Sequence, residues 1–592
     1  MTDFTRLFDI LPYQRQKYPQ NAALCSFENG KVVTYAIQQC IDIIRQLSCG
    51  LLQLGLEKGD TVAILSSYNC PEWTLTDLAI QQAGGIVVPI HATASADECF
   101  YIFNHAQIKW CFVNNQDLYR KISQIKPQTN HLQDIYSFLP INGVSNWKEL
   151  MVNEETWSLK LEEIKKSILP QDIATIIYTS GTTGEPKGVM LSHFNMVSNI
   201  KSLLPILPVS HTDPVLSFLP LSHVFERTAN YIYLAVGASI HYSMITQVEN
   251  RMKKVRPYYF SAVPRVLERM YEEIEKRAEG MVGPKRQIFD WALSVAENYP
   301  FTGKVHWRYA ISLFIARLLV FNNLKKAVGG RVKGVILGAA ALQPRLARIF
   351  TAAGIPVREG YGLTETSPVL SFNRFEPGGS LLGTVGIPIP GVEILLAETD
   401  GEILARGPNI MQGYYKQPEL TQHAISPEGW FHTGDLGVWV NGKFLKITGR
   451  KKELFKISSG KYVAPQPIEN RLRESAFVEN AIVIGDGKRF ITALIVPALG
   501  VLESYCKTNN ITASYDDVPK WLSHPLVITK YRELIDNYNL NFANEHPIRK
   551  YLLLSQPLSI ENGLLTPTLK IKREAVIQKY HREIEDIYSG VS

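Results

Sequence analysis

The 592-residue sequence lacks the long hydrophobic run that marks a membrane-spanning protein. Its most apolar helical stretch, residues 309–321, is interrupted by Arg317 and falls short of the ~20 residues that a membrane span requires. The first residues do not combine a basic start with an apolar core, so we expect no signal peptide. The stretch at 309–321 predicts a helix buried in the core, with a peripheral membrane helix as the alternative.

The sequence also lacks a strong charge of one sign. It carries 62 Lys and Arg against 55 Asp and Glu, a net charge of +7, and the basic blocks that stand out are at 450–452 and 570–573. A dedicated nucleic-acid-binding protein usually shows a denser basic stripe, so no nucleic-acid partner is expected. A mildly basic surface suits anionic small substrates or an anionic membrane face. Nothing in the sequence indicates the oligomeric state.

Cysteines are few and their spacing excludes a disulfide framework. The seven residues lie at positions 25, 40, 49, 70, 99, 111 and 506, without a pair at CxxC spacing. Six of them fall among apolar neighbours in the first 111 residues, which predicts buried, reduced thiols. A reducing cytoplasm is therefore the expected location.

The remaining composition is that of an ordinary globular protein, with 45% hydrophobic and 20% charged residues. Strand-like runs alternate with helical patterns at 61–65, 73–82, 85–89 and 109–113, and similar strands recur at 332–337 and 355–358. This alternation predicts parallel sheets covered by helices. Residues 265–330 are expected to be mainly helical.

The pattern changes near residue 380 to short strands punctuated by Gly and Pro, which predicts a β-rich subdomain. Strands at 481–484 and 491–496 and helices at 465–474 and 517–547 predict a separate α+β tail. The expected fold class is α/β, with a large domain over 1–449 and a small domain over 450–592.

A Gly- and hydroxyl-rich segment follows the expected buried strand at 173–177. Glycine lets backbone N–H groups turn toward an anion, hydroxyls donate to phosphate oxygens, and a lysine adds charge, so this segment is predicted to cradle phosphates. It is not a Walker A loop, and a surface hairpin is the alternative interpretation. The predicted binding residues are Thr179, Ser180, Gly181, Thr182, Thr183, Gly184 and Lys187.

This segment resembles the signature of the adenylate-forming acyl-activating superfamily. Four further segments resemble the family's other motifs in order and spacing, and the resemblance extends over about residues 30–575. They are residues 338–342 (Gly-Ala-Ala-Ala-Leu), 361–366 (Tyr-Gly-Leu-Thr-Glu-Thr), 433–435 (Thr-Gly-Asp) and 449–453 (Gly-Arg-Lys-Lys-Glu).

The residue types fit the roles that this resemblance implies. Glu365 is a hard oxygen ligand suited to Mg²⁺ beside the phosphates of ATP, and Thr364 would donate to the α-phosphate. The adenine would lie against Tyr361 and Gly362 and close to the small residues Gly338, Ala339 and Ala340. A solvated loop acid is the alternative for Glu365, and ordinary packing is the alternative for Tyr361.

Asp435 would accept hydrogen bonds from the ribose hydroxyls and Arg450 would add a charged donor; turn capping is the alternative for Asp435. Lys570 matches the family's C-terminal catalytic lysine, and its neighbour Lys572 is the competitor for that role. The resemblance also implies a mobile C-terminal domain that pivots at Lys452 between two half-reactions.

Residues 220–227, Pro-Leu-Ser-His-Val-Phe-Glu-Arg, resemble long-chain fatty acyl-CoA synthetases. His223 lies where the family places a residue beside the substrate carboxylate. The resemblance implies ATP-dependent activation of a long-chain fatty acid and transfer to coenzyme A. A medium-chain or other carboxylate–CoA ligase remains an alternative, as does a ligase that transfers the acyl group to a carrier protein.

Overall fold

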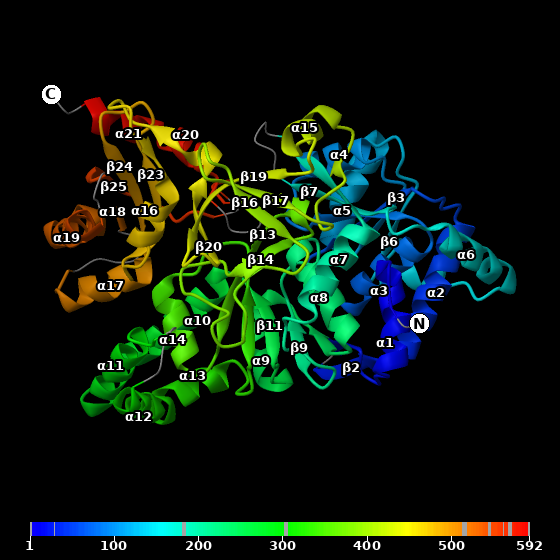
Figure 1. Cartoon of the computed structure of the whole chain (residues 1–592), viewed down its shortest axis with the longest axis horizontal. Helices are drawn as coiled ribbons and strands as arrows, with labels where there is room; N and C mark the ends of the chain where they lie inside the picture. The colour runs from blue at the N-terminus through cyan, green and yellow to red at the C-terminus, as the bar shows by residue number, and fades with distance from the viewer. Residues whose placement is uncertain are drawn as a thin grey trace. The chain divides into compact units, whose positions relative to one another are not determined.

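The computed structural model describes residues 3–28, 30–179, 185–300, 306–511, 518–542, 546–559, 562–565 and 571–589 (Figure 1). The chain forms two compact units. Unit 1 consists of Met1–Leu395, Leu404–Thr433 and Trp439–Lys446, and unit 2 consists of Leu396–Ile403, Gly434–Val438 and Ile447–Ser592.

A seven-stranded sheet occupies the first half of unit 1, in the order β18-β8-β7-β4-β3-β5-β6. Strands β7, β4, β3, β5 and β6 are parallel neighbours, while β8 and β18 pair antiparallel at one edge. Four successive apolar residues in β3 are fully buried, as in a parallel strand covered on both faces. The strands are β3 (Thr61–Ser66), β4 (Ile86–His91), β5 (Trp110–Val113), β6 (Asp134–Ser137), β7 (Ile173–Thr179), β8 (Lys187–Ser192) and β18 (Gly413–Tyr414).

A nine-stranded sheet follows, in the order β15-β14-β13-β12-β11-β9-β10-β1-β2. Its central strands, from β13 to β1, are parallel, and antiparallel strands close both edges. The strands are β1 (Leu24–Glu28), β2 (Lys31–Tyr35), β9 (Pro214–Ser217), β10 (Ser239–Tyr242), β11 (Tyr259–Ala262), β12 (Gly334–Leu337), β13 (Val357–Gly362), β14 (Val369–Phe372) and β15 (Ile387–Pro388).

Helices cover these sheets. Their apolar faces join clusters such as the one around Phe260, Val335 and Phe350. The helices are α1 (Ile10–Lys17), α2 (Ile37–Gln53), α3 (Pro71–Gln82), α4 (Ala96–His105), α5 (Gln116–Ile125), α6 (Glu155–Ser167), α7 (His193–Leu203), α8 (Val224–Val236), α9 (Val248–Val255), α10 (Pro264–Glu279), α11 (Pro284–Glu297), α12 (Trp307–Ala316), α13 (Asn322–Ala327), α14 (Pro344–Ala352) and α15 (Pro418–Ala424).

Short strands form a four-stranded sheet in the region predicted to be β-rich. Its order is β16-β17-β19-β20. The strands are β16 (Glu393–Leu396), β17 (Glu402–Arg406), β19 (Phe431–Val440) and β20 (Phe444–Arg450).

Most of unit 2 is the expected α+β tail. A three-stranded sheet, β23-β24-β25, and a two-stranded sheet, β21-β22, are packed with helices around buried Trp521 and Tyr531. The elements are β21 (Phe455–Lys456), β22 (Tyr462–Val463), α16 (Pro465–Leu472), β23 (Val478–Ile484), β24 (Ile491–Pro497), α17 (Leu499–Thr508), α18 (Val518–Ser523), α19 (Pro525–Phe542), β25 (Ile548–Leu553), α20 (Arg573–Lys579) and α21 (His581–Ser589).

The structure confirms the strands and helices predicted in the first 115 residues within a few positions, and all seven cysteines are free and buried. The prediction of a core helix over 309–321 is wrong in part. Leu313, Ala316 and Phe321 are buried, but Phe314 and Leu318 on the other face are exposed. No helix within the described ranges combines the length and the apolarity needed to cross a bilayer.

Candidate functional site

Several of the predicted residues of unit 1 follow strands that end at one edge of the nine-stranded sheet. Strands β9, β11, β12 and β13 are parallel, so their carboxyl ends meet there. His223 follows β9, residues 338–340 follow β12, and Glu365 follows β13. Ligands of open α/β sheets characteristically bind at this edge.

The loop after β12 is tightly held. A Cβ on Gly338 would lie 3.0 Å from the Phe225 ring, so a side chain there would require the ring to shift. Ala339 adopts a φ of 72°, a left-handed conformation that is uncommon for a residue other than glycine. The backbone N–H of Leu342 donates to the Glu359 carboxyl group at 3.1 Å. Burial raises the pKa of Glu359 to about 7. These contacts define the path of the loop after β12.

The segment after β13 places Thr364 and Glu365 on a short 3₁₀ turn, η6 (Thr364–Thr366). Tyr361 is buried and pairs with Ser371 on β14. Gly362 approaches the chain so closely that a Cβ would lie 1.7 Å from the Pro368 carbonyl oxygen. Only glycine fits this position, which sets the direction in which the turn leaves the strand.

Glu365 is linked to the strand that begins with Lys187. The Tyr414 hydroxyl donates to Glu365 Oε1 at 3.0 Å, and the Lys187 ammonium lies 5.4 Å from the centre of the Tyr414 ring. Strand β18 pairs with β8, which fixes Tyr414 opposite Val189. Burial raises the pKa of Tyr414 above its ordinary value, so the hydroxyl stays a donor. The structure thus brings together the predicted metal ligand and the predicted phosphate-binding lysine.

The two ends of the predicted phosphate cradle lie side by side, because Thr179 on β7 pairs with Lys187 on β8. The other cradle residues lie outside the described part of the chain: Ser180, Gly181, Thr182, Thr183 and Gly184.

His223 immediately precedes helix α8 and faces the other parallel sheet. Its ring centre lies 5.2 Å from that of His91, the last residue of β4. Burial lowers the pKa of His91 to about 4, which keeps its ring neutral near pH 7. His91, at the end of β4 in the seven-stranded sheet, and His223, which follows β9 of the nine-stranded sheet, therefore lie next to each other.

The next residues of α8 are deeply buried. Ser217 donates to the Glu226 carboxyl group at 2.6 Å, and burial raises the pKa of Glu226 to about 8. Arg227 forms an ion pair with Asp77 and donates to Thr175 at 2.8 Å. This network joins α8 to both sheets and supports the helix that His223 precedes.

A crevice of about 360 Å³ lies beside His91, at the carboxyl ends of β3, β4 and β5. Strand β3 has β4 on one side and β5 on the other, so this is a point where the strand order reverses. Such a point is a preferred ligand position in open α/β sheets. Hydroxyl and amide groups share the lining with apolar surface: Ser66, Ser67, Tyr68, Asn69, His91, Ala92, Thr93, Asn115, Asp117, Leu118, Lys121, Phe218, Pro220 and Ile245.

In unit 2 the structure brings Asp435 and Arg450 together. Arg450 Nε lies 3.0 Å from Asp435 Oδ1; the carboxylate is 5% exposed and the arginine 49%. The adjacent Lys451 pairs with Asp400 at 2.7 Å and with Glu402 at 2.8 Å. A half-exposed donor beside a buried carboxylate is suited to a polyhydroxyl ligand.

The two remaining predictions also concern unit 2. Lys452 lies on the exposed turn η7 (Lys451–Glu453) that follows β20. Lys570 lies outside the described residues, but the chain on both sides of it is well anchored. Leu565 bridges to Ile571, and Arg573 binds Glu469 at 2.5 Å.

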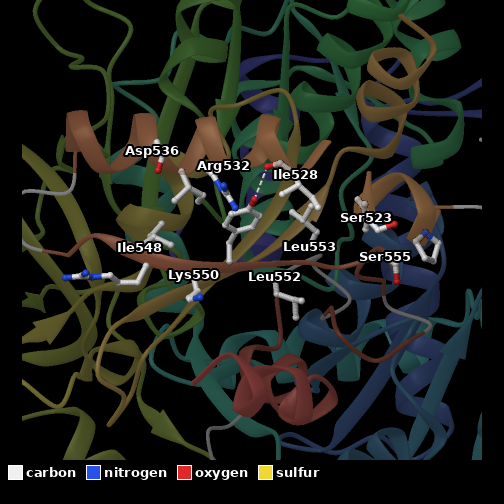
Figure 2. A pocket seen from close by; sticks show the side chains of 14 residues that line it. Ser523, Ile528, Arg532, Asp536, Ile548, Lys550, Leu552, Leu553 and Ser555 are labelled. Atoms are coloured by element: carbon white, nitrogen blue, oxygen red, sulfur yellow. Dashed lines mark hydrogen bonds between the residues drawn. The ribbon is translucent and has the colours of Figure 1, made fainter. Parts of the chain in front are cut away.

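A separate groove of about 710 Å³ lies between α18, α19 and β25 (Figure 2). Arg532 and Asp536 come from α19, and the Tyr551 hydroxyl donates to the Ile528 carbonyl oxygen at 2.9 Å. It contains none of the residues that the sequence predicts for the site.

Several groups of the site were missed from the sequence. Glu226 and Arg227 could have been found as charges within an apolar helix, whereas Glu359 lies in a strand that also carries Arg358 and two glycines and so does not stand out. No local pattern points to Tyr414 or His91, because strand pairing and the packing of two sheets bring them to the site.

Comparisons with known proteins identify the family. The description "AMP-binding enzyme" matches residues 11–415, and "AMP-binding enzyme C-terminal domain" matches residues 453–592. Long chain acyl-CoA synthetase 4 of Arabidopsis thaliana is 31% identical over 99% of this chain and 92% of its own length. Long-chain-fatty-acid–CoA ligase FadD15 of Mycobacterium tuberculosis is 32% identical over 92% of this chain and 91% of its own length.

Solved structures share the fold and confirm the expected fold class. ATP-bound MatB from Rhodopseudomonas palustris superposes with a TM-score of 0.71 at 20% identity, covering 99% of both chains. The adenylation domain of a carboxylate reductase from Mycobacterium chelonae gives 0.76 at 20% identity, covering 99% of this chain and 91% of its own. The chain therefore belongs to the AMP-binding enzyme family.

Proposed function

We propose that the protein is an AMP-forming long-chain fatty acid–CoA ligase. The observation that carries this proposal is the 31% identity, over 99% of the chain, to a long chain acyl-CoA synthetase. The strand-end site of unit 1, with Glu365 and Lys187 joined through Tyr414, supports it. The expected location is a reducing cytoplasm, with contact at the inner face of a membrane.

In the first half-reaction, a carboxylate oxygen of the fatty acid attacks the α-phosphorus of ATP and diphosphate leaves. Glu365 would hold Mg²⁺, which would supply positive charge to balance the phosphates of ATP. Thr364, Lys187 and residues 179–184 would bind the phosphates, since hydroxyl, ammonium and backbone N–H groups are all donors. The adenine would rest on Gly338, Ala339, Ala340, Tyr361 and Gly362.

His223 would orient the fatty carboxylate. Its place before α8 is fixed by the buried Arg227–Asp77 pair one turn further along. Unit 2 would add Lys570 to balance charge at the α-phosphate, and Asp435 and Arg450 to bind the ribose. We place the boundary between the two domains at residue 449, with Lys452 as the hinge.

In the second half-reaction, the deprotonated sulfur of coenzyme A attacks the acyl carbonyl carbon, and AMP leaves. We propose that the crevice beside His91 receives the pantetheine arm. The crevice places the hydroxyl, amide and ammonium groups of Ser67, Asn115 and Lys121 beside apolar surface. Pantetheine, which carries two amides on a short chain of methylenes, combines the same two kinds of group.

A bulky residue at the crevice tests this assignment. Thr93 is exposed on its lining. We expect Thr93→Trp to raise the KM for coenzyme A at least tenfold and to leave fatty-acid-dependent ATP–diphosphate exchange unchanged, with Thr93→Ser as the control. If exchange is lost and the KM for coenzyme A is unchanged, the crevice instead serves the first half-reaction.

The function itself is tested by measuring both half-reactions across fatty acids from C6 to C20. We expect exchange and acyl-CoA formation to be greatest with long chains. A maximum at medium chains would support a medium-chain ligase, and exchange without acyl-CoA would favour transfer to a carrier protein. An absence of exchange with every fatty acid would contradict the proposal.

A further inference from the structure

Helix α12 and the π-helical turn after it, η5 (Arg317–Phe321), expose a continuous apolar stripe. Residues spaced by three or four lie on one face of a helix. Trp307 is 62% exposed, Phe314 67% and Leu318 60%. The complete stripe consists of Trp307, Ile311, Phe314, Ile315, Leu318 and Leu319.

The opposite face of the same helix is already used for packing. Leu313, Ala316 and Phe321 are buried in the core cluster of the nine-stranded sheet. A helix that is apolar on all sides is normally buried on all sides. Here one side is exposed, and α12 lies at the periphery of unit 1 (Figure 1). Neighbouring α11 adds the exposed residues Ile288 and Trp291.

Basic residues predominate around the stripe, and Asp290 on neighbouring α11 pairs with Arg286 at 2.9 Å. From residue 298 to residue 358 the sequence contains no Asp or Glu. The guanidinium of Arg308 lies 5.3 Å from the Trp307 ring, and Lys325 and Lys326 occupy the last turn of α13. The basic residues in this range are Lys304, Arg308, Arg317, Lys325, Lys326, Arg331, Lys333, Arg345, Arg348 and Arg358.

We propose that this stripe docks the protein on the surface of an anionic lipid bilayer. Trp beside Arg or Lys is the usual composition of a helix that lies in the headgroup region, where apolar side chains enter the acyl boundary and cations meet lipid phosphates. Basic side chains near an anionic surface add attraction that decays within a Debye length. The helix would therefore lie on the bilayer rather than cross it.

A second copy of the chain fits this surface less well. A two-fold interface brings the same patch of both subunits together. The basic residues that border the stripe, Arg308, Lys325 and Lys326, would then be brought toward the same residues of the other copy, and like charges at an interface are unfavourable. An anionic bilayer would take up the apolar side chains of the stripe in its acyl region and pair the basic residues at its border with lipid phosphates.

Docking on a bilayer would extend the proposed function, because long-chain fatty acids partition into membranes and would then reach the enzyme from the surface to which it is bound. The surface argument does not depend on that function. Binding and catalysis are accordingly measured separately.

The test is sedimentation with vesicles of phosphatidylcholine alone and of phosphatidylcholine with 30 mol% phosphatidylglycerol. The test variant carries Trp307→Ser, Phe314→Ser and Leu318→Ser. The matched control carries Leu159→Ser, Leu169→Ser and Leu540→Ser, which are 63%, 56% and 86% exposed elsewhere on the protein. A charge variant carries Lys325→Glu and Lys326→Glu. Circular dichroism and the melting temperature verify that each variant is folded.

We expect the wild type and the control to bind the anionic vesicles, with at least tenfold weaker partitioning for the test variant. The charge variant should lose the preference for phosphatidylglycerol, and added salt should weaken binding of the wild type. The proposal is overturned if the wild type binds neither vesicle or if the test variant binds as well as the control. It is equally overturned if light scattering shows a dimer that the test variant converts to a monomer.

Exchange with water-soluble octanoate separates this proposal from the proposed function. All variants should keep wild-type exchange with octanoate, because none of the substituted residues belongs to the site. If the wild type shows no exchange with any fatty acid while vesicle binding behaves as expected, the function fails and the docking surface stands.

Discussion

The two compact units hold the charged groups of the candidate site in different ways. In unit 1, Arg227 and Asp77 are fully buried, and Glu226 is a buried carboxyl group that stays largely protonated near pH 7. In unit 2, Arg450 is half exposed where it meets Asp435. A buried pair is formed once, during folding, whereas an exposed pair exchanges with water continuously.

From this difference we expect the charged groups of unit 1 to serve stability and those of unit 2 to serve turnover. In unit 1 the buried charges hold the helices and strands that carry the substrate-binding residues. Burying these charges costs desolvation energy, which only well-formed pairing offsets. Exposure in unit 2 leaves side chains able to exchange one partner for another, as a domain that serves two half-reactions requires. Substitutions in unit 1 should therefore act mainly on stability, and substitutions in unit 2 mainly on turnover.

The largest effect is expected for Arg227→Met in unit 1. It leaves Asp77 as a buried, unpaired charge and should lower the free energy of unfolding by about 3–5 kcal/mol. Denaturation in urea, followed by tryptophan fluorescence, measures the loss. Adding Asp77→Leu to this variant should restore most of the stability. A variant as stable as the wild type would show that the buried pair does not set the framework.

Lys570→Ala in unit 2 should reduce turnover and leave stability unchanged. We expect ATP–diphosphate exchange to fall by about 10²–10³-fold, or roughly 3–4 kcal/mol of barrier, because a charge aimed at the reacting phosphate is lost. The melting temperature should stay within about 1 °C of the wild type. Lys572→Ala is the control; if it is the more damaging substitution, the catalytic assignment belongs to Lys572.

Glu226 predicts a pH dependence of stability confined to unit 1. Its folded pKa of about 8 lies above the ordinary value of 4.5, so its contribution to stability is complete below pH 4.5 and is lost as pH rises through 8. At about 1.4 kcal/mol per pKa unit the loss cannot exceed about 5 kcal/mol, and relaxation around the carboxylate should reduce it to roughly half.

Glu226→Gln should remove this loss between pH 5 and pH 9, which urea denaturation at several pH values measures. Glu162→Gln, on the exposed face of α6, is the matched control and should follow the wild type. Parallel pH profiles for the wild type and Glu226→Gln would contradict a protonated Glu226.

The smallest effect, and the most selective, is expected at Lys452. Proline restricts the backbone rotation on which a hinge depends. Lys452→Pro should spare acyl-adenylate formation and reduce thioester formation at least tenfold, while Lys452→Ala should retain both. Single-turnover assays of each half-reaction make the measurement, and equal loss of both would refute the hinge.

Much of the fold could be predicted because its buried strands appear in the sequence as short apolar runs. The runs at 61–65 and 109–113 are almost entirely apolar and became β3 and β5, since a parallel strand is buried on both faces. The position of Gly362 could not be predicted, because the carbonyl oxygen that excludes a side chain there belongs to Pro368 on the following turn.

The site was predictable as a set of residue types but not as a set of contacts. Glu365 and Lys187 were both expected to bind ATP, yet their link through Tyr414 depends on pairing between β8 and β18, which lie more than 200 positions apart in the sequence. The exposed face of α12 was mistaken for core because both faces of that helix are equally apolar. Composition alone cannot distinguish a face that packs on the core from one that does not.

The acid-free range from 298 to 358 concentrates positive charge in one stretch of the sequence. Outside that range the chain carries 52 Lys and Arg against 55 Asp and Glu, so its net charge of +7 becomes −3 when the range is left out. Of the basic residues in this range, Arg308, Lys325 and Lys326 lie on the helices that carry and follow the apolar stripe. Electrostatic attraction to an anionic surface extends over about a Debye length, whereas apolar contact requires close approach, so these side chains would meet the surface's field before the stripe makes contact.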